Sequence, residues 1–138
     1  MAFLRNFPLL VLPLILYNLL SFGLMRVAGP IWQGPALSLP MISGADFILS
    51  RGDLLILFAL GLLFFEILKA TRTARATIVD HLLSTLVFVA YLIQFIVDPR
   101  AATFPFFTCL MIAFLDVVAG YSISIRVASR DVTLDRGL

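Results

Sequence analysis

The residues that could take part in chemistry are a few polar side chains set among long apolar runs. Two carboxylates, Glu66 and Asp116, lie inside such runs, in the segments LLFFEILK and AFLDVVAG. A charged group is costly in the hydrocarbon core of a bilayer, so an ionisable residue there indicates a specific role. It is either neutral or paired with a group on another helix. These two residues are therefore candidates for passing protons or ions.

Further polar residues share the inner half of the predicted membrane with these carboxylates. Counted at ~1.5 Å per residue from the cytoplasmic helix ends, Glu66 lies about 6 Å deep and Asp116 about 14 Å deep. We expect a column from the cytoplasm to mid-membrane, which suits a one-sided proton path or a small polar ligand site. A packing role, with Asp116 bonded to Asn18, Tyr17 or Ser84, fits equally well. The members of this network are Asn18, Glu66, Ser84, Thr85, Asp116 and Tyr121.

A basic stripe follows the second apolar run. Lys69, Arg72 and Arg75 recur every three residues, so they continue one face of a helix from the membrane into water. Anionic headgroups attract cations in this position. Glu66 and Lys69 also have the i,i+3 spacing of a helical ion pair. The stripe therefore predicts the cytoplasmic side of the protein.

Asp80 and His81 lie at the same predicted interface. Asp80 is expected to cap the third helix, and His81 to face solvent or headgroups. Neighbouring side chains point about 100° apart on a helix. They therefore lack the Glu-x-x-His spacing of a bundle metal site. With one histidine, no paired haem ligands and no phosphate-binding loop, the sequence predicts neither a metal nor a cofactor.

Four apolar runs must position these residues. Hydrophobic residues make up 62% of the 138-residue chain, far more than a soluble domain of this size needs. Each run has about the length that crosses a bilayer as a helix. The predicted fold class is all-α, a single-domain antiparallel bundle of four transmembrane helices at residues 7–25, 53–70, 78–97 and 104–125.

Local signals mark where these helices begin and end. Ser50–Asp53 and Thr77–Asp80 both have the spacing of a capping box, and Thr103 precedes a proline in the next first turn. Asp98-Pro99 is expected to stop the third helix. Pro13 is expected to bend the first helix. The tail after residue 125 is predicted to be a frayed helical end.

The connection at residues 26–52 is rich in glycine and proline yet too apolar for a solvated loop. We expect it to lie along the periplasmic headgroup layer, with Trp32 as an interfacial anchor and a short helical turn at residues 45–49.

The distribution of lysine and arginine predicts orientation. Cations are enriched on the cytoplasmic side of membrane proteins, and seven of the ten lie on the side that holds both termini. Because the cations sit beside apolar runs, the net charge of +2 indicates anionic lipid rather than nucleic acid as the partner. The seven are Arg5, Lys69, Arg72, Arg75, Arg126, Arg130 and Arg136; the other three are Arg26, Arg51 and Arg100.

The chain resembles small uncharacterised bacterial inner-membrane proteins of four predicted spans. The likeness rests on GDLLILFALGLLFFEILKATRTARATIVDHLLSTLVFVAYLIQF and LDVVAGYSISI, from about residue 50 onward. It implies an inner-membrane location and no particular activity.

Three functions remain open. The favoured one is a non-enzymatic accessory or assembly subunit of a membrane complex, acting on a membrane-protein partner or as a homo-oligomer. The second is a small oligomeric transporter or proton-conducting element using Asp116 and Glu66. The third is a lipid-modifying enzyme using Asp80 and His81.

Overall fold

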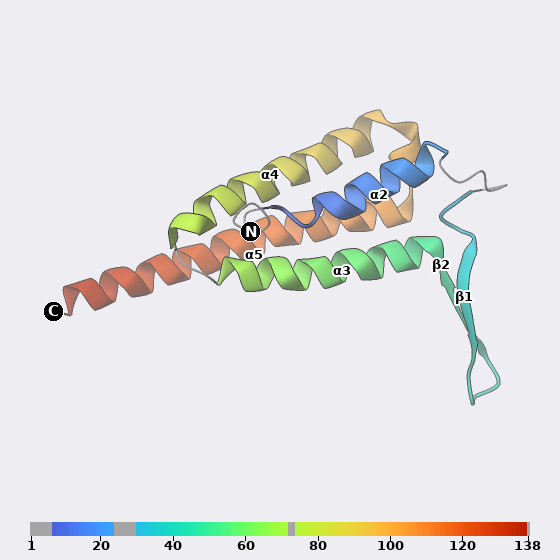
Figure 1. Ribbon diagram of the computed structural model, residues 1–138, viewed down its shortest axis with the longest axis horizontal. Coiled ribbons are helices and arrows are strands. Elements are labelled where there is room, and N and C mark those ends of the chain that lie inside the picture. The colour runs from blue at the N-terminus through green and yellow to red at the C-terminus, as the bar shows by residue number, and fades with distance from the viewer. Residues whose placement is uncertain (1–6, 24–29, 72–73, 138) are drawn as a thin grey trace.

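A bundle of helices with one projecting β-hairpin makes up the fold (Figure 1). The computed structural model describes residues 7–23, 30–71 and 74–137. In Figure 1, α2, α3 and α4 run alongside α5, the hairpin leaves one end of the bundle, and the C-terminus lies at the other. The elements are α2 (Val11–Ser21), β1 (Pro35–Pro40), β2 (Asp46–Ser50), α3 (Arg51–Ala70), α4 (Ala74–Val97), the short 3-10 helix η1 (Pro99–Ala101) and α5 (Phe104–Arg136).

Three predicted helix boundaries are confirmed. Ser50 and Asp53 form a complete capping box at the start of α3. Thr103 caps α5 by accepting from the Phe106 N–H, and α4 stops at Val97, directly before Asp98-Pro99. Each cap satisfies backbone N–H groups that a helix start leaves without a partner.

Expectations about three other helices are wrong. The first helix begins at Val11, so Pro13 is its third residue, where a missing N–H costs nothing, and it has no ladder bond to break. The third begins at Ala74, which places Asp80 in the second turn rather than at the cap. The last continues to Arg136, because no glycine or proline interrupts it between Gly120 and Gly137.

The helical turn expected at residues 45–49 is wrong, since this segment belongs to strand β2. Strands β1 and β2 pair antiparallel, with Leu37 opposite Leu49 and Leu39 opposite Phe47. Gly44 turns the chain with φ at 84°, a conformation that favours glycine. The side chains from residue 45 alternate in polarity only weakly, so the strand pattern was hidden.

An aromatic layer fills the bundle near the hairpin. Tyr17 and Trp32 stack with ring centroids 4.5 Å apart, and Phe106 packs edge-on against Tyr17 at 4.8 Å. The Tyr17 hydroxyl donates to the Arg100 carbonyl oxygen at 2.6 Å. Trp32 is only 7% exposed, so its expected role as an interfacial anchor is wrong. It instead attaches the chain before β1 to the bundle core.

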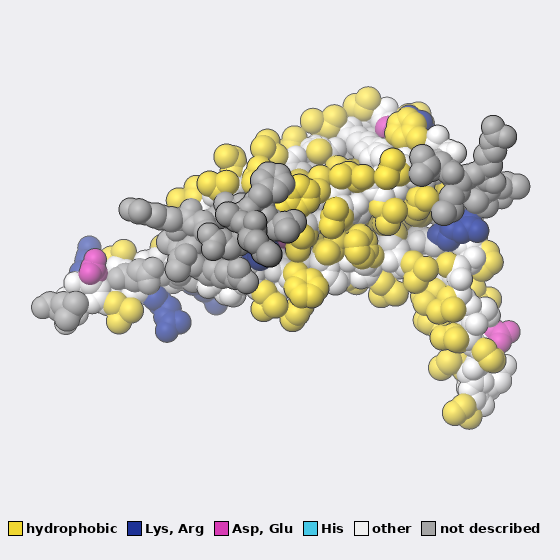
Figure 2. All heavy atoms as spheres, in the orientation of Figure 1, with side chains coloured by type: hydrophobic (Ala, Val, Ile, Leu, Met, Phe, Trp, Pro, Cys, Tyr) yellow, Lys and Arg dark blue, Asp and Glu magenta, His cyan; other side chains and the backbone are white. Residues whose placement is uncertain are grey.

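The outer surface of the bundle is apolar. Figure 2 shows hydrophobic side chains over most of the visible face of the helices. Among the described residues, two stretches are long and apolar enough to cross a membrane, Ile78–Val97 in α4 and Phe104–Arg136 in α5. Only 22% of the α4 window is buried, whereas the core helix of a soluble protein is mostly buried. The all-α prediction is confirmed, and these two helices support association with a membrane.

Candidate functional site

Glu66 and Lys69 join α3 to the segment that precedes α2. Lys69 Nζ lies 3.1 Å from Glu66 Oε2 and donates to the Phe7 carbonyl oxygen at 2.7 Å. Glu66 Oε1 accepts a hydrogen bond from the backbone N–H of Leu9. The predicted i,i+3 pair is thus present, with side chains 4% and 13% exposed. The two side chains therefore form an ion pair with each other, and each also hydrogen-bonds to a backbone group.

The basic stripe is wrong for its first member. Lys69 turns into the bundle toward Glu66 instead of reaching toward headgroups, because it pairs with a buried carboxylate and donates to the Phe7 carbonyl oxygen. The side chains of Arg72 and Arg75 lie outside the described residues. Their role in the stripe stays a prediction.

Asp116 and its neighbours enclose a cavity of about 10 Å³, close to the volume that one water molecule needs. Asp116 is 6% exposed and hydrogen-bonds to Ser84 on α4. Asp80 Oδ1 is buried with no hydrogen-bond partner among the described residues. The cavity is lined by Glu66, Lys69, Ala70, Asp80, His81, Ser84 and Asp116.

The sequence predicted that His81 faces solvent or headgroups, and this prediction is wrong. Its ring is 6% exposed, and Nε2 hydrogen-bonds to Ser124 Oγ on α5. Gly120 makes room for the ring, since a Cβ at this position would lie 2.5 Å from His81 Cε1. The small residue allows α4 and α5 to approach closely, which places the histidine between them.

Of the remaining members of the expected column, Asn18 lies apart from the cluster. Asn18 forms an amide pair with Gln94, in which Asn18 Nδ2 donates at 3.0 Å and Gln94 Nε2 donates back at 2.6 Å. Gln94 lies four residues before Asp98, near the hairpin end, so Asn18 belongs to the opposite half of the bundle. Thr85 donates to the His81 carbonyl oxygen and hydrogen-bonds to the Tyr121 hydroxyl at 3.4 Å, and the Tyr121 ring lies 5.2 Å from the His81 ring, so both residues border the cluster. The expected column therefore does not extend to Asn18, and its other members gather in or beside one cluster.

The cluster can hold one water molecule or a proton between α3, α4 and α5. Its acidic groups come from three helices, and its one lysine is already paired. In the part of the chain that the structure describes, no three His, Cys, Asp or Glu side chains converge as metal ligands. The aromatic layer of Tyr17, Trp32 and Phe106 belongs to the hydrophobic core and does not line this cluster.

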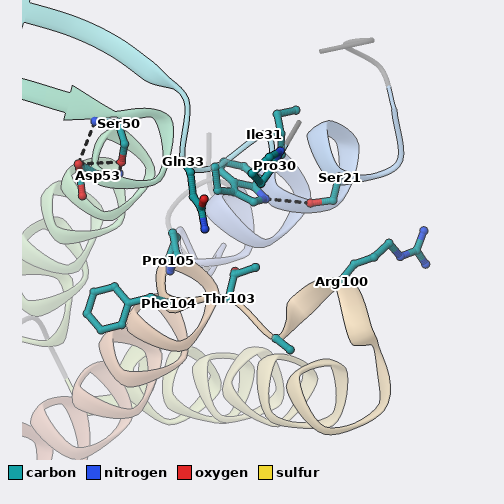
Figure 3. A pocket seen from close by; sticks show the side chains of 12 residues that line it. Ser21, Pro30, Ile31, Gln33, Ser50, Asp53, Arg100, Thr103, Phe104 and Pro105 are labelled. Carbon is teal, nitrogen blue, oxygen red and sulfur yellow. Dashed lines mark hydrogen bonds between the residues drawn. The ribbon is translucent and has the colours of Figure 1, made fainter. Parts of the chain in front are cut away.

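An open pocket of about 670 Å³ lies at the hairpin end, and the sequence did not predict it (Figure 3). Figure 3 shows the Gln33 side chain pointing into it and the Arg100 side chain pointing away. The Ser50–Asp53 cap and the bond from Trp32 Nε1 to Ser21 Oγ lie at its wall. The sequence did hold one signal for this pocket: the helix caps at Ser50 and Thr103 and the turn-rich segment at residues 26–52 all fall at the same end of the predicted bundle.

Comparison with known proteins gave no match to a family model, to a curated protein or to a solved structure. The resemblance to small bacterial four-span proteins therefore stays a prediction.

Proposed function

We propose that the chain is a multi-pass inner-membrane protein with four spans and both termini in the cytoplasm. In this proposal it is not an enzyme. It acts by binding, as an accessory or assembly subunit of a membrane complex. The two apolar helices support the membrane location, and α3, although it contains Asp53, Glu66 and Lys69, adds 20 helical residues beside them. α2, with 11 residues, is shorter than the ~20 residues that cross a bilayer, so the first of the four spans rests on the apolar run at residues 7–25 of the sequence.

The observation that carries this proposal is the hairpin. It projects from the bundle at a steep angle to the helices, so in a membrane it would lie along the headgroup layer (Figure 1). Leu37, Leu39 and Phe47 point to one face of the two-stranded sheet and are 44%, 46% and 49% exposed. Hydrophobic side chains follow the whole projection in Figure 2.

Such a hairpin needs a partner surface. A two-stranded sheet is marginally stable in water, and both of its edges offer unpaired backbone groups. A membrane protein seated on the apolar face would bury these leucines and the phenylalanine. We therefore assign the hairpin as the docking element for the partner.

Site-specific photocrosslinking in intact cells tests the docking element. A photoreactive amino acid at Phe47 should give one discrete adduct with a membrane protein. The same group at Ser38, which points to the opposite face, should give little or none. Equal protein adducts from both positions, or adducts with lipid alone from Phe47, would show that the hairpin is not a docking surface.

The second function, a transporter or proton-conducting element using Asp116 and Glu66, would depend on the polar cluster. The cavity in this cluster has room for about one water, and both Glu66 oxygens are already hydrogen-bonded. This geometry fits a packing role better than a path. A lipid-modifying role for Asp80 and His81 has less support, because the His81 ring lies between helices, away from headgroups.

A further inference from the structure

A second groove runs between α2 and α3, on the outside of the bundle. It holds about 320 Å³, and almost all of its wall is apolar. Leu16 and Leu54, from the two helices, are 38% and 42% exposed. The groove is lined by Leu16, Leu20, Ile31, Trp32, Arg51, Leu54, Leu55 and Phe58.

Arg51 is the one charged residue in this wall. Its guanidinium donates to the Ile31 carbonyl oxygen at 3.2 Å and lies against Gly34, where a Cβ would come within 2.7 Å of Nη1. Neither of the two ion pairs formed by described residues includes it. Among the described residues, the cation at the first turn of α3 therefore has no ion-pair partner, and its hydrogen bond to Ile31 orients it.

The depth of this cation matches a lipid headgroup. Arg51 begins α3 beside the hairpin, at the end of the bundle that the proposed topology places in the periplasmic headgroup layer. From Arg51 to Phe58 the helix rises about 10 Å into the membrane, and the groove follows it. A phosphate on the guanidinium would complement its charge, and an acyl chain would cover the leucines below it.

We propose that this groove binds one phospholipid, with the phosphate on Arg51 and an acyl chain between α2 and α3. The site rests on the proposed membrane topology. It is distinct from the hairpin face, since it is lined by α2, α3 and the segment before β1 and by no residue of the two strands.

The only tryptophan of the chain, Trp32, lines the groove and reports on its occupant. Phosphatidylglycerol with brominated acyl chains, titrated into detergent-purified protein, should quench Trp32 fluorescence saturably. Brominated diacylglycerol, which lacks the phosphate, should bind more weakly. Arg51→Gln should raise the half-saturating phosphatidylglycerol concentration roughly fivefold and remove the preference over diacylglycerol. Arg100 lies at the same end of the bundle but pairs with Asp98. Arg100→Gln should therefore leave the binding of both lipids unchanged.

A second pair of variants tests the acyl-chain contact without altering charge. Leu54→Gln should weaken the quenching by both lipids. Leu57→Gln, on an exposed position of α3 that does not line the groove, should not. If neither Arg51→Gln nor Leu54→Gln changes lipid binding, and the protein has the proposed topology, the lipid site is wrong and the proposed function stands. A protein that fails the topology overturns the proposed function and the site with it.

Discussion

Replacing Lys69 by methionine should lower the free energy of unfolding by about 3–5 kcal/mol, because it leaves Glu66 charged, buried and without its cation. The variant also removes the donor to the Phe7 carbonyl oxygen, which releases the segment before α2. Unfolding in mixed micelles with increasing mole fraction of sodium dodecyl sulfate measures the loss.

Two controls separate the buried pair from a general effect of charge. Glu66→Gln combined with Lys69→Met should recover most of the loss, because a glutamine can still accept from the Leu9 N–H. Arg130→Met removes an exposed cation from the end of α5 and should change stability by less than about 0.5 kcal/mol. If Lys69→Met behaves like Arg130→Met, the pair does not hold the N-terminal segment.

Replacing Gly120 by alanine should destabilise the fold by about 1–3 kcal/mol, the usual cost of an overpacked contact. The new methyl group would lie 2.5 Å from His81 Cε1 and 2.6 Å from His81 Nδ1. The same substitution in a His81→Ala background should cost close to nothing, since the ring that it meets is gone. Chemical unfolding of the four proteins of this double-mutant cycle measures the coupling.

Gly61 provides the matched control on α3. No atom lies within 4 Å of a Cβ placed there, so Gly61→Ala should be neutral or stabilise the helix by up to about 1 kcal/mol. A Gly120→Ala protein as stable as Gly61→Ala would show that α4 and α5 do not pack through His81.

The caps were predictable from the sequence because their causes are local. Ser50, Asp53 and Thr103 each act within one helical turn, and Glu66 meets Lys69 three residues away on the same helix. Interactions within one helical turn can be recognised from the sequence without knowledge of the fold.

The composition of the polar cluster depends on contacts that no local pattern encodes. The depths estimated along each helix predicted that Asn18 lies near Asp116. In the structure Asn18 instead hydrogen-bonds to Gln94, an amide far along the chain. His81 was assigned to the surface by its distance from the helix end. It is buried because Gly120, on another helix, leaves space for its ring.

The hairpin was missed for a different reason. The alternation Leu37-Ser38-Leu39 is too short to identify a strand, and the consecutive apolar residues Phe47, Ile48 and Leu49 hide the alternation in the second strand. The turn at Gly44 was visible among the glycine and proline residues, whereas the pairing of the strands was not.

Membrane topology tests the central claim most directly. An alkaline phosphatase reporter, active only in the periplasm, can be inserted at residue 43 in the hairpin turn or fused after residue 138. We expect high activity from the hairpin insertion and none from the C-terminal fusion, because an odd number of spans separates the two sites. Activity at both positions, or at neither, would contradict a bundle that crosses the membrane with the hairpin outside and the C-terminus in the cytoplasm.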